Sequence, residues 1–280
     1  MLDNIIIDRI IKNALREDLG WGDVTTNSTI PDTALIRGNF IAKEEGIICG
    51  IEVCRRVFEM VDGTIDFQAR MKDGQRAFKG DIIAEISGNA RSILKGERTA
   101  LNFFQRMSGI ATMTSKYVSE ISGLKTRIVD TRKTAPGLRI LDKYSVKAGG
   151  GFNHRFNLSD MVLIKDNHIK AAGGITPAVA AARAKGSHGL KIEVEVESIR
   201  ELIEAIEAGA DIVMLDNMTL DMMKEAVSIA SGKVLLEASG NITIGGERSV
   251  RAVAETGVDI ISAGALTNSV KAMDISLRFL

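Results

Sequence analysis

The feature that most constrains the fold is a repeat in the second half of the chain, in which short apolar runs alternate with helical patterns. Each run is mainly β-branched or aliphatic and ends in a polar residue or glycine, which is typical of a buried parallel strand. The six runs are TRIVDT, MVLIK, KIEVEV, DIVMLD, KVLLEAS and VDIISAG, and helical patterns such as SIRELIEAIEAG separate them. Six strands are fewer than a closed βα barrel contains. We therefore expect an incompletely closed α/β barrel, with a doubly wound sheet as the alternative.

The part of the chain before this repeat mixes helices and strands. Apolar residues from Ile6 to Leu15 recur at helical spacing, with Asp3 as the predicted N-cap and Gly20 as the predicted stop. A long helix is predicted from Ala90, and the pair Ser108-Gly109 is expected to kink or end it. Between them the patterns predict a loop over residues 20–26, a strand over 35–43, a helix over 50–61, an extended segment over 64–71 and a strand over 81–87.

Composition and charge narrow the functional classes. The 280 residues are 45% hydrophobic and 26% charged, as in folded globular proteins. Lys plus Arg equals Asp plus Glu at 36 each, so we expect neither nucleic acid nor an anionic membrane as a partner. The start of the chain lacks the features of a signal peptide, and no window has the apolar length of a spanning helix. Cys49 and Cys54 match no zinc or redox spacing, so we expect buried thiols in a cytoplasmic enzyme.

Charged residues gather at the carboxyl ends of the predicted strands, where the catalytic loops of a βα barrel converge. Two apolar runs are followed by basic residues, Arg132 and Lys133 after Thr131 in one case and Lys165 in the other. These three cations would be half-buried and would need an anionic partner. That partner is an internal acid or a ligand, and we favour a ligand. By contrast, Arg139 and Lys143 are expected on the solvated face of a helix. The glycines 149–151 would let the backbone approach a ligand and turn His154 and Arg155 inward.

Two carboxylates, Glu195 and Asp216, end neighbouring predicted strands. Such a pair can hold Mg²⁺ through water or bind sugar hydroxyls, because that ion prefers oxygen ligands. The spacing is equally consistent with a structural role, in which the two carboxylates form salt bridges to nearby lysine and arginine residues. Glu193 and Glu197 share the strand face with Glu195, and alternation does not separate their roles.

Small residues follow the last two strands, at the place where βα barrels commonly bind phosphate through backbone N–H groups and a helix N-terminus. They are Ser239, Gly240 and Asn241 after one strand, and Ser262, Ala263 and Gly264 after the next. No P-loop, dinucleotide fingerprint, zinc motif or nucleophile elbow is present in the sequence. The sequence therefore indicates an enzyme with an anionic small substrate.

Collinear segments over nearly the whole chain resemble the quinolinate phosphoribosyltransferase family. They include EDLGWGDVTT, GERTALNFFQRMSGIAT, DTRKTAPGLR, KAGGGFNHRFNLSD, LIKDNHI, EVEVES, EASGNI and ISAGALTNS. The resemblance implies an N-terminal α/β sandwich domain over residues 1–106, joined by 270–280, and an incompletely closed α/β barrel over 107–269. It also implies a homodimer with composite active sites, which could assemble further into a hexamer.

The same resemblance implies the reaction of quinolinate with 5-phosphoribosyl-1-pyrophosphate and Mg²⁺, which forms nicotinate mononucleotide, pyrophosphate and CO₂ in NAD biosynthesis. The implied catalytic residues are Lys165, Glu195 and Asp216, with the two carboxylates near the ribose and the metal. The implied basic pocket contains Arg98, Arg132, Lys133, His154, Arg155 and Lys165, with Thr131 beside it. The implied 5-phosphate site contains Ser239, Gly240, Asn241, Ser262, Ala263 and Gly264. Many relatives have glycine where this chain has Asn241.

Other functions remain open at this point. A related phosphoribosyltransferase could act on another aromatic acid or belong to molybdate metabolism. A Schiff-base aldolase could use Lys165, because strand-end lysines of barrels can be nucleophiles. A non-catalytic regulator could keep the pocket and bind a phosphometabolite.

Overall fold

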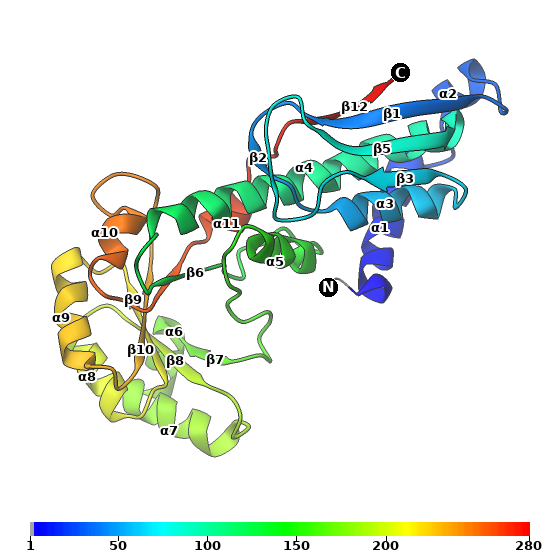
Figure 1. Cartoon of the computed structure of the whole chain (residues 1–280). Coiled ribbons are helices and arrows are strands. Elements are labelled where there is room, and N and C mark those ends of the chain that lie inside the picture. Colours follow the sequence, from blue (N-terminus) through cyan, green and yellow to red (C-terminus); the bar gives the residue numbers. More distant parts are fainter. Residues whose placement is uncertain (1–2) are drawn as a thin grey trace. The chain divides into compact units, whose positions relative to one another are not determined.

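The computed structural model describes residues 3–280, which form two compact units (Figure 1). The first unit contains the chain up to Ser115, Thr134–Gly150 and Ser269–Leu280, and the second contains Lys116–Lys133 and Gly151–Asn268. Each unit is defined by the contacts among its own residues and is assembled from separate stretches of the chain. The predicted domain boundary between residues 106 and 107 therefore stays a prediction. Within the described part of the chain, every helix is too short or too polar to cross a membrane. The cytoplasmic location also stays a prediction.

The first unit is built on an antiparallel sheet with the strand order β12-β1-β5-β3. The last strand of the chain, β12, pairs with β1, with Phe40 opposite Leu277. The strands are β1 (Leu35–Ala42), β2 (Gly46–Ile47), β3 (Asp66–Ala69), β4 (Arg76–Ala77), β5 (Ile82–Asn89) and β12 (Ile275–Phe279), with β2 and β4 forming a separate pair. The helices are α1 (Asn4–Leu19), α2 (Val24–Thr29), α3 (Ile51–Val61), α4 (Ala90–Glu120) and α5 (Arg139–Ala148).

Aromatic and aliphatic side chains from helices and sheet meet in one core. Phe40 of β1 lies 6.0 Å from Phe58 of α3 and 6.2 Å from Phe104 of α4, measured between ring centres, and both contacts are edge-on. The helix α1 buries Ile7, Ile11 and Leu15, the face that its periodicity predicts. Its predicted ends are confirmed as well, since Asp3 caps the first turn and Gly20 follows the last residue. Cys49 and Cys54 are buried free thiols, as expected.

The helix α4 continues through Ser108-Gly109, so the expected end there is wrong, whereas a kink stays a prediction. Both residues instead serve close packing within the first unit. A Cβ atom on Gly109 would lie 2.2 Å from the carbonyl oxygen of Lys271, so only glycine leaves room for that segment. The Ser108 hydroxyl donates to the carbonyl of Cys49 and accepts from its N–H. A pattern that resembles a helix break is here a pair of contacts between distant segments.

Two further expectations for the first unit need correction. The predicted loop over residues 20–26 already contains the start of α2, because the Asp23 side chain accepts from the N–H of Thr26 and caps a helix there. Lys143 is buried rather than solvated, and so is its neighbour Asp142. The helix α5 is therefore packed on a face where we expected water, with Asp142 paired to Arg106 at 2.8 Å.

The second unit contains a parallel sheet with the strand order β6-β11-β10-β9-β8-β7. Apart from β6, neighbours in space are also neighbours in sequence, so the strand order does not reverse as it does in a doubly wound sheet. The two edge strands, β6 and β7, do not pair with each other among the described residues. The expected incompletely closed α/β barrel is confirmed. Its strands are β6 (Arg127–Val129), β7 (Val162–Ile164), β8 (Ile192–Val196), β9 (Ile212–Asp216), β10 (Leu235–Ser239) and β11 (Ile260–Ser262).

The helices of the second unit follow the strands that they connect. Those from α7 to α10 lie side by side along the sheet (Figure 1), and α7 contacts α8, which contacts α9. Apolar strands such as β9 are thereby buried along their length, which explains why they read as continuous apolar runs. The helices are α6 (Asp166–Ala172), α7 (Ile175–Lys185), α8 (Ile199–Glu207), α9 (Leu220–Ala230), α10 (Val250–Ala254) and α11 (Ala265–Asn268).

Candidate active site

A pocket of about 330 Å³ lies in the second unit at the carboxyl ends of the parallel strands. This is the position at which α/β barrels carry their functional loops. Eight of the residues predicted for the site line it: Thr131, Arg132, Lys133, His154, Arg155, Lys165, Ser239 and Ser262. Leu163, Met214 and Glu237 complete the lining. The structure thus brings together side chains from segments that are more than a hundred residues apart.

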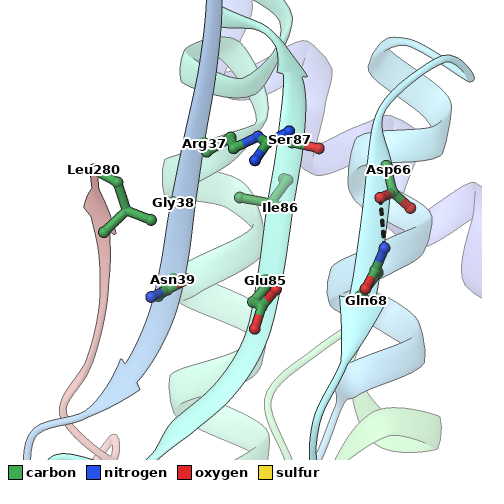
Figure 2. Close-up of a pocket in the computed structure, with 9 residues that line it drawn as sticks. All are labelled: Arg37, Gly38, Asn39, Asp66, Gln68, Glu85, Ile86, Ser87 and Leu280. Atoms are coloured by element: carbon green, nitrogen blue, oxygen red, sulfur yellow. Dashed lines mark hydrogen bonds between the residues drawn. The ribbon is translucent and has the colours of Figure 1, made fainter.

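A second hollow of similar volume, about 330 Å³, lies on the antiparallel sheet of the first unit (Figure 2). Its side chains carry both signs of charge, with Arg37, Asp66 and Glu85 among them. Glu85 is already paired with Arg70 at 2.9 Å. The single arginine of this hollow faces two acids, one of them already paired, which gives little reason to bind an anion, so the pocket in the second unit is the better candidate.

The segment after β6 is fixed by hydrogen bonds to its backbone. The Lys133 N–H donates to the Thr131 hydroxyl at 3.0 Å, and the Thr267 hydroxyl donates to the Lys133 carbonyl at 2.8 Å. Gly264 lies against this segment, because a Cβ atom there would be 3.0 Å from the Lys133 side chain. The backbone from Thr131 to Lys133 is therefore held in place while the Lys133 side chain stays exposed.

Like charges are held close together in the pocket. Burial lowers the pKa of Arg155, and the neighbouring positive charge of Arg132 lowers it further. The Arg155 guanidinium donates to the carbonyl of Met161 at 3.2 Å. Lys165, at the N-cap of α6, contacts the carboxylate of Glu195. The cations repel one another when the pocket is empty, and an anionic ligand would relieve that repulsion.

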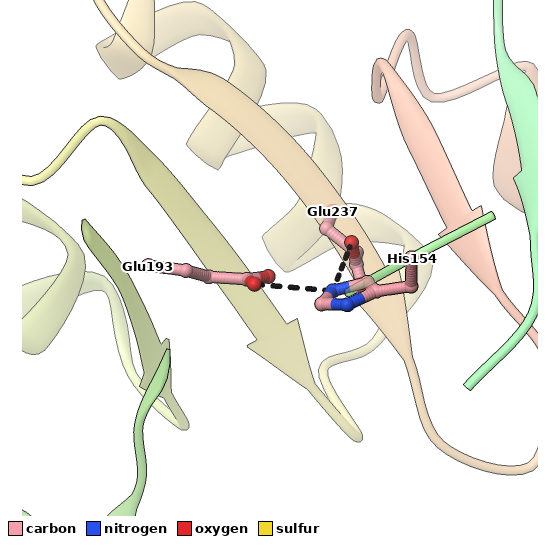
Figure 3. A group of neighbouring side chains, drawn as sticks. All are labelled: His154, Glu193 and Glu237. Carbon is pink, nitrogen blue, oxygen red and sulfur yellow. Dashed lines mark ion pairs between the residues drawn. The ribbon is translucent and has the colours of Figure 1, made fainter. Parts of the chain in front are cut away.

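Beneath these cations, His154 lies between two buried carboxylates (Figure 3). Its Nε2 atom is 3.1 Å from Glu193 Oε2, from β8, and 3.3 Å from Glu237 Oε2, from β10. Glu193 is 0% exposed and Glu237 is 1% exposed. The side chain of His154 thus points inward, as predicted, but it points at acids within the protein.

The three groups together retain a proton at neutral pH. Burial lowers the pKa of His154, but its contacts with Glu193 and Glu237 outweigh burial and raise the pKa to about 10. Burial also raises the pKa of Glu193. The Arg155 N–H donates to His154 Nδ1 at 2.8 Å, which leaves no place for a second proton on the ring. We therefore assign the ring proton to Nε2 and the additional proton to Glu193, whose pKa burial raises.

A further buried acid, Asp130, fixes the loop that carries His154. One of its carboxylate oxygens accepts from the His154 N–H at 2.9 Å, and the other accepts from the Asn153 side chain at 2.6 Å. Asp130 follows β6 directly and is 0% exposed. Because hydrogen bonds to a buried carboxylate are strong, this contact holds the loop against the end of the strand.

The two carboxylates predicted near a metal lie at the ends of β8 and β9. Glu195 pairs with Lys165, and the Asn217 side chain donates to Asp216 Oδ2 at 2.9 Å. Asn217 itself adopts a positive φ of 53°. Both carboxylates lie near the ends of strands that are hydrogen-bonded to each other, with Glu195 opposite Met214. Oxygen donors at adjacent strand ends fit a hydrated Mg²⁺ ion, so the residues present are compatible with that metal.

The loop after β10 depends on a close approach between two segments. Gly240 has a φ of +91°, and a Cβ atom there would lie 2.2 Å from Asn217 Oδ1. The helix that follows this loop, α10, begins at Val250. After β11 the helix α11 begins at Ala265. The Ser262 hydroxyl oxygen is buried and lacks a hydrogen-bond partner among the described residues, which leaves it for a ligand.

Two predicted features lie elsewhere. Arg98 is exposed on α4 in the part of that helix that belongs to the first unit. Gly149 serves the packing of α5 against α4, because a Cβ atom there would lie 2.4 Å from the carbonyl of Ala111 in α4. The expected approach of the glycines 149–151 to a ligand stays a prediction.

Sequence reasoning did not assign roles to the buried acids Asp130, Glu193 and Glu237. A signal was present for two of them, because KIEVEV and KVLLEAS each place glutamate inside an otherwise apolar strand. A charge in a strand that is covered on both faces must have a partner. The strand order that puts Glu193 and Glu237 on either side of His154 could not be read from these runs.

An incompletely closed parallel barrel with a cation-lined pocket at its carboxyl ends defines an α/β-barrel domain that binds anions. Models of known families extend this result. The model of the quinolinate phosphoribosyl transferase N-terminal domain matches residues 23–108, and that of the C-terminal domain matches residues 110–278. The chain belongs to the quinolinate phosphoribosyltransferase family.

Individual relatives are similar to this chain over nearly its full length. The chain is 42% identical to a probable carboxylating nicotinate-nucleotide pyrophosphorylase of Bacillus subtilis, which covers 99% of this chain and 94% of that protein. The solved nicotinate-nucleotide pyrophosphorylase of Francisella tularensis is 45% identical, with a TM-score of 0.93 over 100% of this chain and 98% of its own. The solved NadC of Streptococcus pyogenes is 42% identical, with a TM-score of 0.94, and the match covers 100% of this chain and 99% of that one.

Proposed function

We propose that this chain is a carboxylating nicotinate-nucleotide pyrophosphorylase, which joins quinolinate to 5-phosphoribosyl-1-pyrophosphate in NAD biosynthesis. The observation that carries the proposal is the pocket in which Arg132, Lys133, Arg155 and Lys165 converge. Quinolinate has two adjacent carboxylates, and its partner has a phosphate and a diphosphate. Several fixed cations are needed to offset these charges away from bulk water.

The residues suit different parts of the two substrates. The planar guanidinium groups of Arg132 and Arg155 match carboxylates, and the Lys133 ammonium acts as a point charge near phosphate. The loops 239–241 and 262–264 would hold the 5-phosphate through backbone N–H groups and the free Ser262 hydroxyl. Arg98 would complete the pocket in a homodimer with composite sites.

In the reaction, the ring nitrogen of quinolinate forms a bond to C1 of the ribose as the bond to pyrophosphate breaks. Glu195 and Asp216 would stabilise the positive charge that develops on the ribose, and Lys165 would hold the substrate carboxylate. The carbon–carbon bond to the carboxylate beside the ring nitrogen then breaks and releases CO₂. The electron pair stays on that ring carbon, where the adjacent positive nitrogen stabilises it, and a proton from water then completes nicotinate mononucleotide.

Glu195 and Asp216 would also hold Mg²⁺ through water, and the ion would offset charge on the pyrophosphate as it leaves. Lys165 is poorly suited to a Schiff-base aldolase, because its side chain is 44% exposed and paired with Glu195. A nucleophilic lysine of that kind is typically desolvated in an apolar pocket, whereas the Lys165 side chain is partly solvated and has an acidic partner. The geometry favours phosphoribosyl transfer over this alternative.

Purified protein should release pyrophosphate and CO₂ from quinolinate only when 5-phosphoribosyl-1-pyrophosphate and Mg²⁺ are both present. Nicotinate should not replace quinolinate, because one carboxylate leaves part of the cationic pocket unmatched. A coupled assay of pyrophosphate release measures turnover with quinolinate and with nicotinate. Equal turnover of nicotinate would contradict the assignment of quinolinate, and absence of turnover with every aromatic acid would favour a binding regulator.

A further inference from the structure

The imidazole of His154 has protein partners on both nitrogens, and this determines what it can do in the pocket. Its Nε2 atom faces Glu193 and Glu237 at 3.1 and 3.3 Å. Its Nδ1 atom accepts from the Arg155 N–H at 2.8 Å. A ring that is engaged at both nitrogens does not have a free donor to offer to a substrate carboxylate. Its two ring nitrogens instead connect the buried acids Glu193 and Glu237 to the backbone N–H of Arg155.

Arg155 is the residue on which this connection acts. Its N–H is fixed by His154, and its guanidinium reaches the Met161 carbonyl at 3.2 Å while lining the pocket. Asp130 holds the His154 N–H at 2.9 Å. The backbone on both sides of the His154 side chain is thus held by hydrogen bonds that lead to buried carboxylates.

The two glutamates are costly to bury, which indicates a role beyond stability. Glu193 and Glu237 are 0% and 1% exposed, and three of their four carboxylate oxygens have no hydrogen-bond partner among the described residues. Apolar residues would fill strands β8 and β10 at lower cost. The His154 ring lies between the two carboxylates and contacts both of them.

We propose that Glu193 and Glu237 are positioning residues that fix the ring of His154, and that His154 in turn fixes the backbone of Arg155 so that its guanidinium meets a carboxylate of quinolinate. The proposal rests on the proposed function for the identity of the ligand. In this arrangement both carboxylates act through His154, although Glu237 also lines the pocket. Their effect should therefore fall on the binding of the aromatic acid and not on the chemical step.

The first test separates KM from kcat. Glu237→Gln keeps the volume of the side chain and replaces its carboxylate by a neutral amide, so the ring loses an anionic acceptor. We expect the KM for quinolinate to rise roughly ten- to a hundredfold, with a much smaller change in kcat and in the KM for 5-phosphoribosyl-1-pyrophosphate. Glu225→Gln, on the exposed side of α9, is the matched control and should behave as the wild type. A loss confined to kcat would overturn the proposal.

A double-mutant cycle shows whether the glutamate acts through the histidine. His154→Ala should also raise the KM for quinolinate. If Glu237 acts only through His154, then adding Glu237→Gln to His154→Ala should cause little further change. Equal effects of Glu237→Gln in both backgrounds would show that it acts by another route. Thermal melting of each variant checks that the protein is folded.

A third measurement does not depend on activity. The chain has three histidines, and of these His168 and His188 are exposed. In protein labelled with ¹⁵N-histidine, His154 should give a slowly exchanging ring N–H signal at Nε2, and this signal should move or vanish in Glu237→Gln. An unprotonated Nε2 in the wild type would overturn the proposal, whether or not quinolinate is the substrate.

The same three side chains could also hold a metal ion, since their ligand atoms lie within 4.8 Å of one another. The NMR samples therefore need elemental analysis. Less than a tenth of an equivalent of zinc, iron or manganese is the result expected from the proposal. A full equivalent of one of these metals that a chelator removes, with a change in the His154 signal, would replace the positioning role by a metal site.

Discussion

At the scale of single residues, charge and burial explain the pocket. Arg132 and Arg155 are close enough that the charge of one lowers the pKa of the other. Two like charges stay together because the surrounding structure holds their segments, as the hydrogen bonds to the Lys133 and His154 backbones show. The energy stored in this repulsion is released when an anion binds, so the cations contribute more to binding than exposed cations would.

Removing a cation of the pocket should therefore cost activity without unfolding the protein. Arg132→Ala and Lys165→Ala should each reduce turnover about a hundredfold or more, since removing one group that stabilises developing charge costs about 2.7 to 4 kcal/mol in comparable sites. Steady-state kinetics and circular dichroism measure activity and fold. Lys233→Ala is the control, because that exposed lysine precedes β10 at the opposite end of the strand. Near-normal turnover in both pocket variants would show that these residues form only surface salt bridges.

At the scale of elements, the loops after β9 and β10 depend on each other. Asn217 follows β9 with a positive φ, its amide donates to Asp216, and its Oδ1 atom occupies the space beside Gly240. The Asn241 side chain lies 3.4 Å from the same oxygen. One asparagine thus links the carboxylate end of β9 to the proposed phosphate loop.

Gly240→Ala should disturb this link. The new Cβ would lie 2.2 Å from Asn217 Oδ1, and the residue has a φ of +91°, so the loop must move. Gly246→Ala is a matched control, with a φ of +81° and open space around the added atom. Both substitutions should lose about 1–3 kcal/mol of stability from backbone strain.

Only Gly240→Ala should also raise the KM for 5-phosphoribosyl-1-pyrophosphate, by roughly tenfold. Thermal melts and steady-state kinetics of the two variants separate strain from displacement of the loop. If both variants change the KM equally, the contact with Asn217 has no special part in binding.

At the scale of the whole molecule, the chain forms two units that are each assembled from distant segments. The last strand, β12, returns to the sheet of the first unit, and residues 134–150 leave the barrel sequence to join the same unit. Arg98 belongs to the first unit, whereas the other predicted cations of the pocket belong to the second. A homodimer with composite sites would allow Arg98 of one subunit to complete the pocket of the other.

Subunit mixing tests this assembly. Arg98→Ala and Lys165→Ala should each be nearly inactive alone. After exchange, a mixed dimer would contain one doubly altered site and one intact site. Random reassortment makes about half of the dimers mixed, so roughly a quarter of the wild-type activity should return. Mass spectrometry of tagged subunits verifies the exchange. No recovery after verified exchange would mean that Arg98 acts within its own chain or only structurally.

The sequence alone was sufficient where the determining physics is local. A strand that is buried on both faces needs a mainly apolar run, so DIVMLD predicted β9 correctly, and the alternating Ile and Val of KIEVEV predicted β8. Helical periodicity and an N-cap likewise predicted α1. The cations at strand ends stood out because a half-buried charge needs a partner. The family resemblance supplied the reaction and the remaining residues of the site.

The tertiary structure decided what depends on contacts between segments that are far apart in the chain. The pattern around Ser108-Gly109 suggested a helix break, whereas the backbone of Lys271 approaches so closely that glycine is required in a continuous helix. Lys143 lay on a predicted solvated face and is buried. Glu193 and Glu237 meet around His154 because β8 and β10 flank β9 in the sheet. Periodicity records which face of an element is apolar, but the neighbour that covers that face is chosen by the packing of the whole chain.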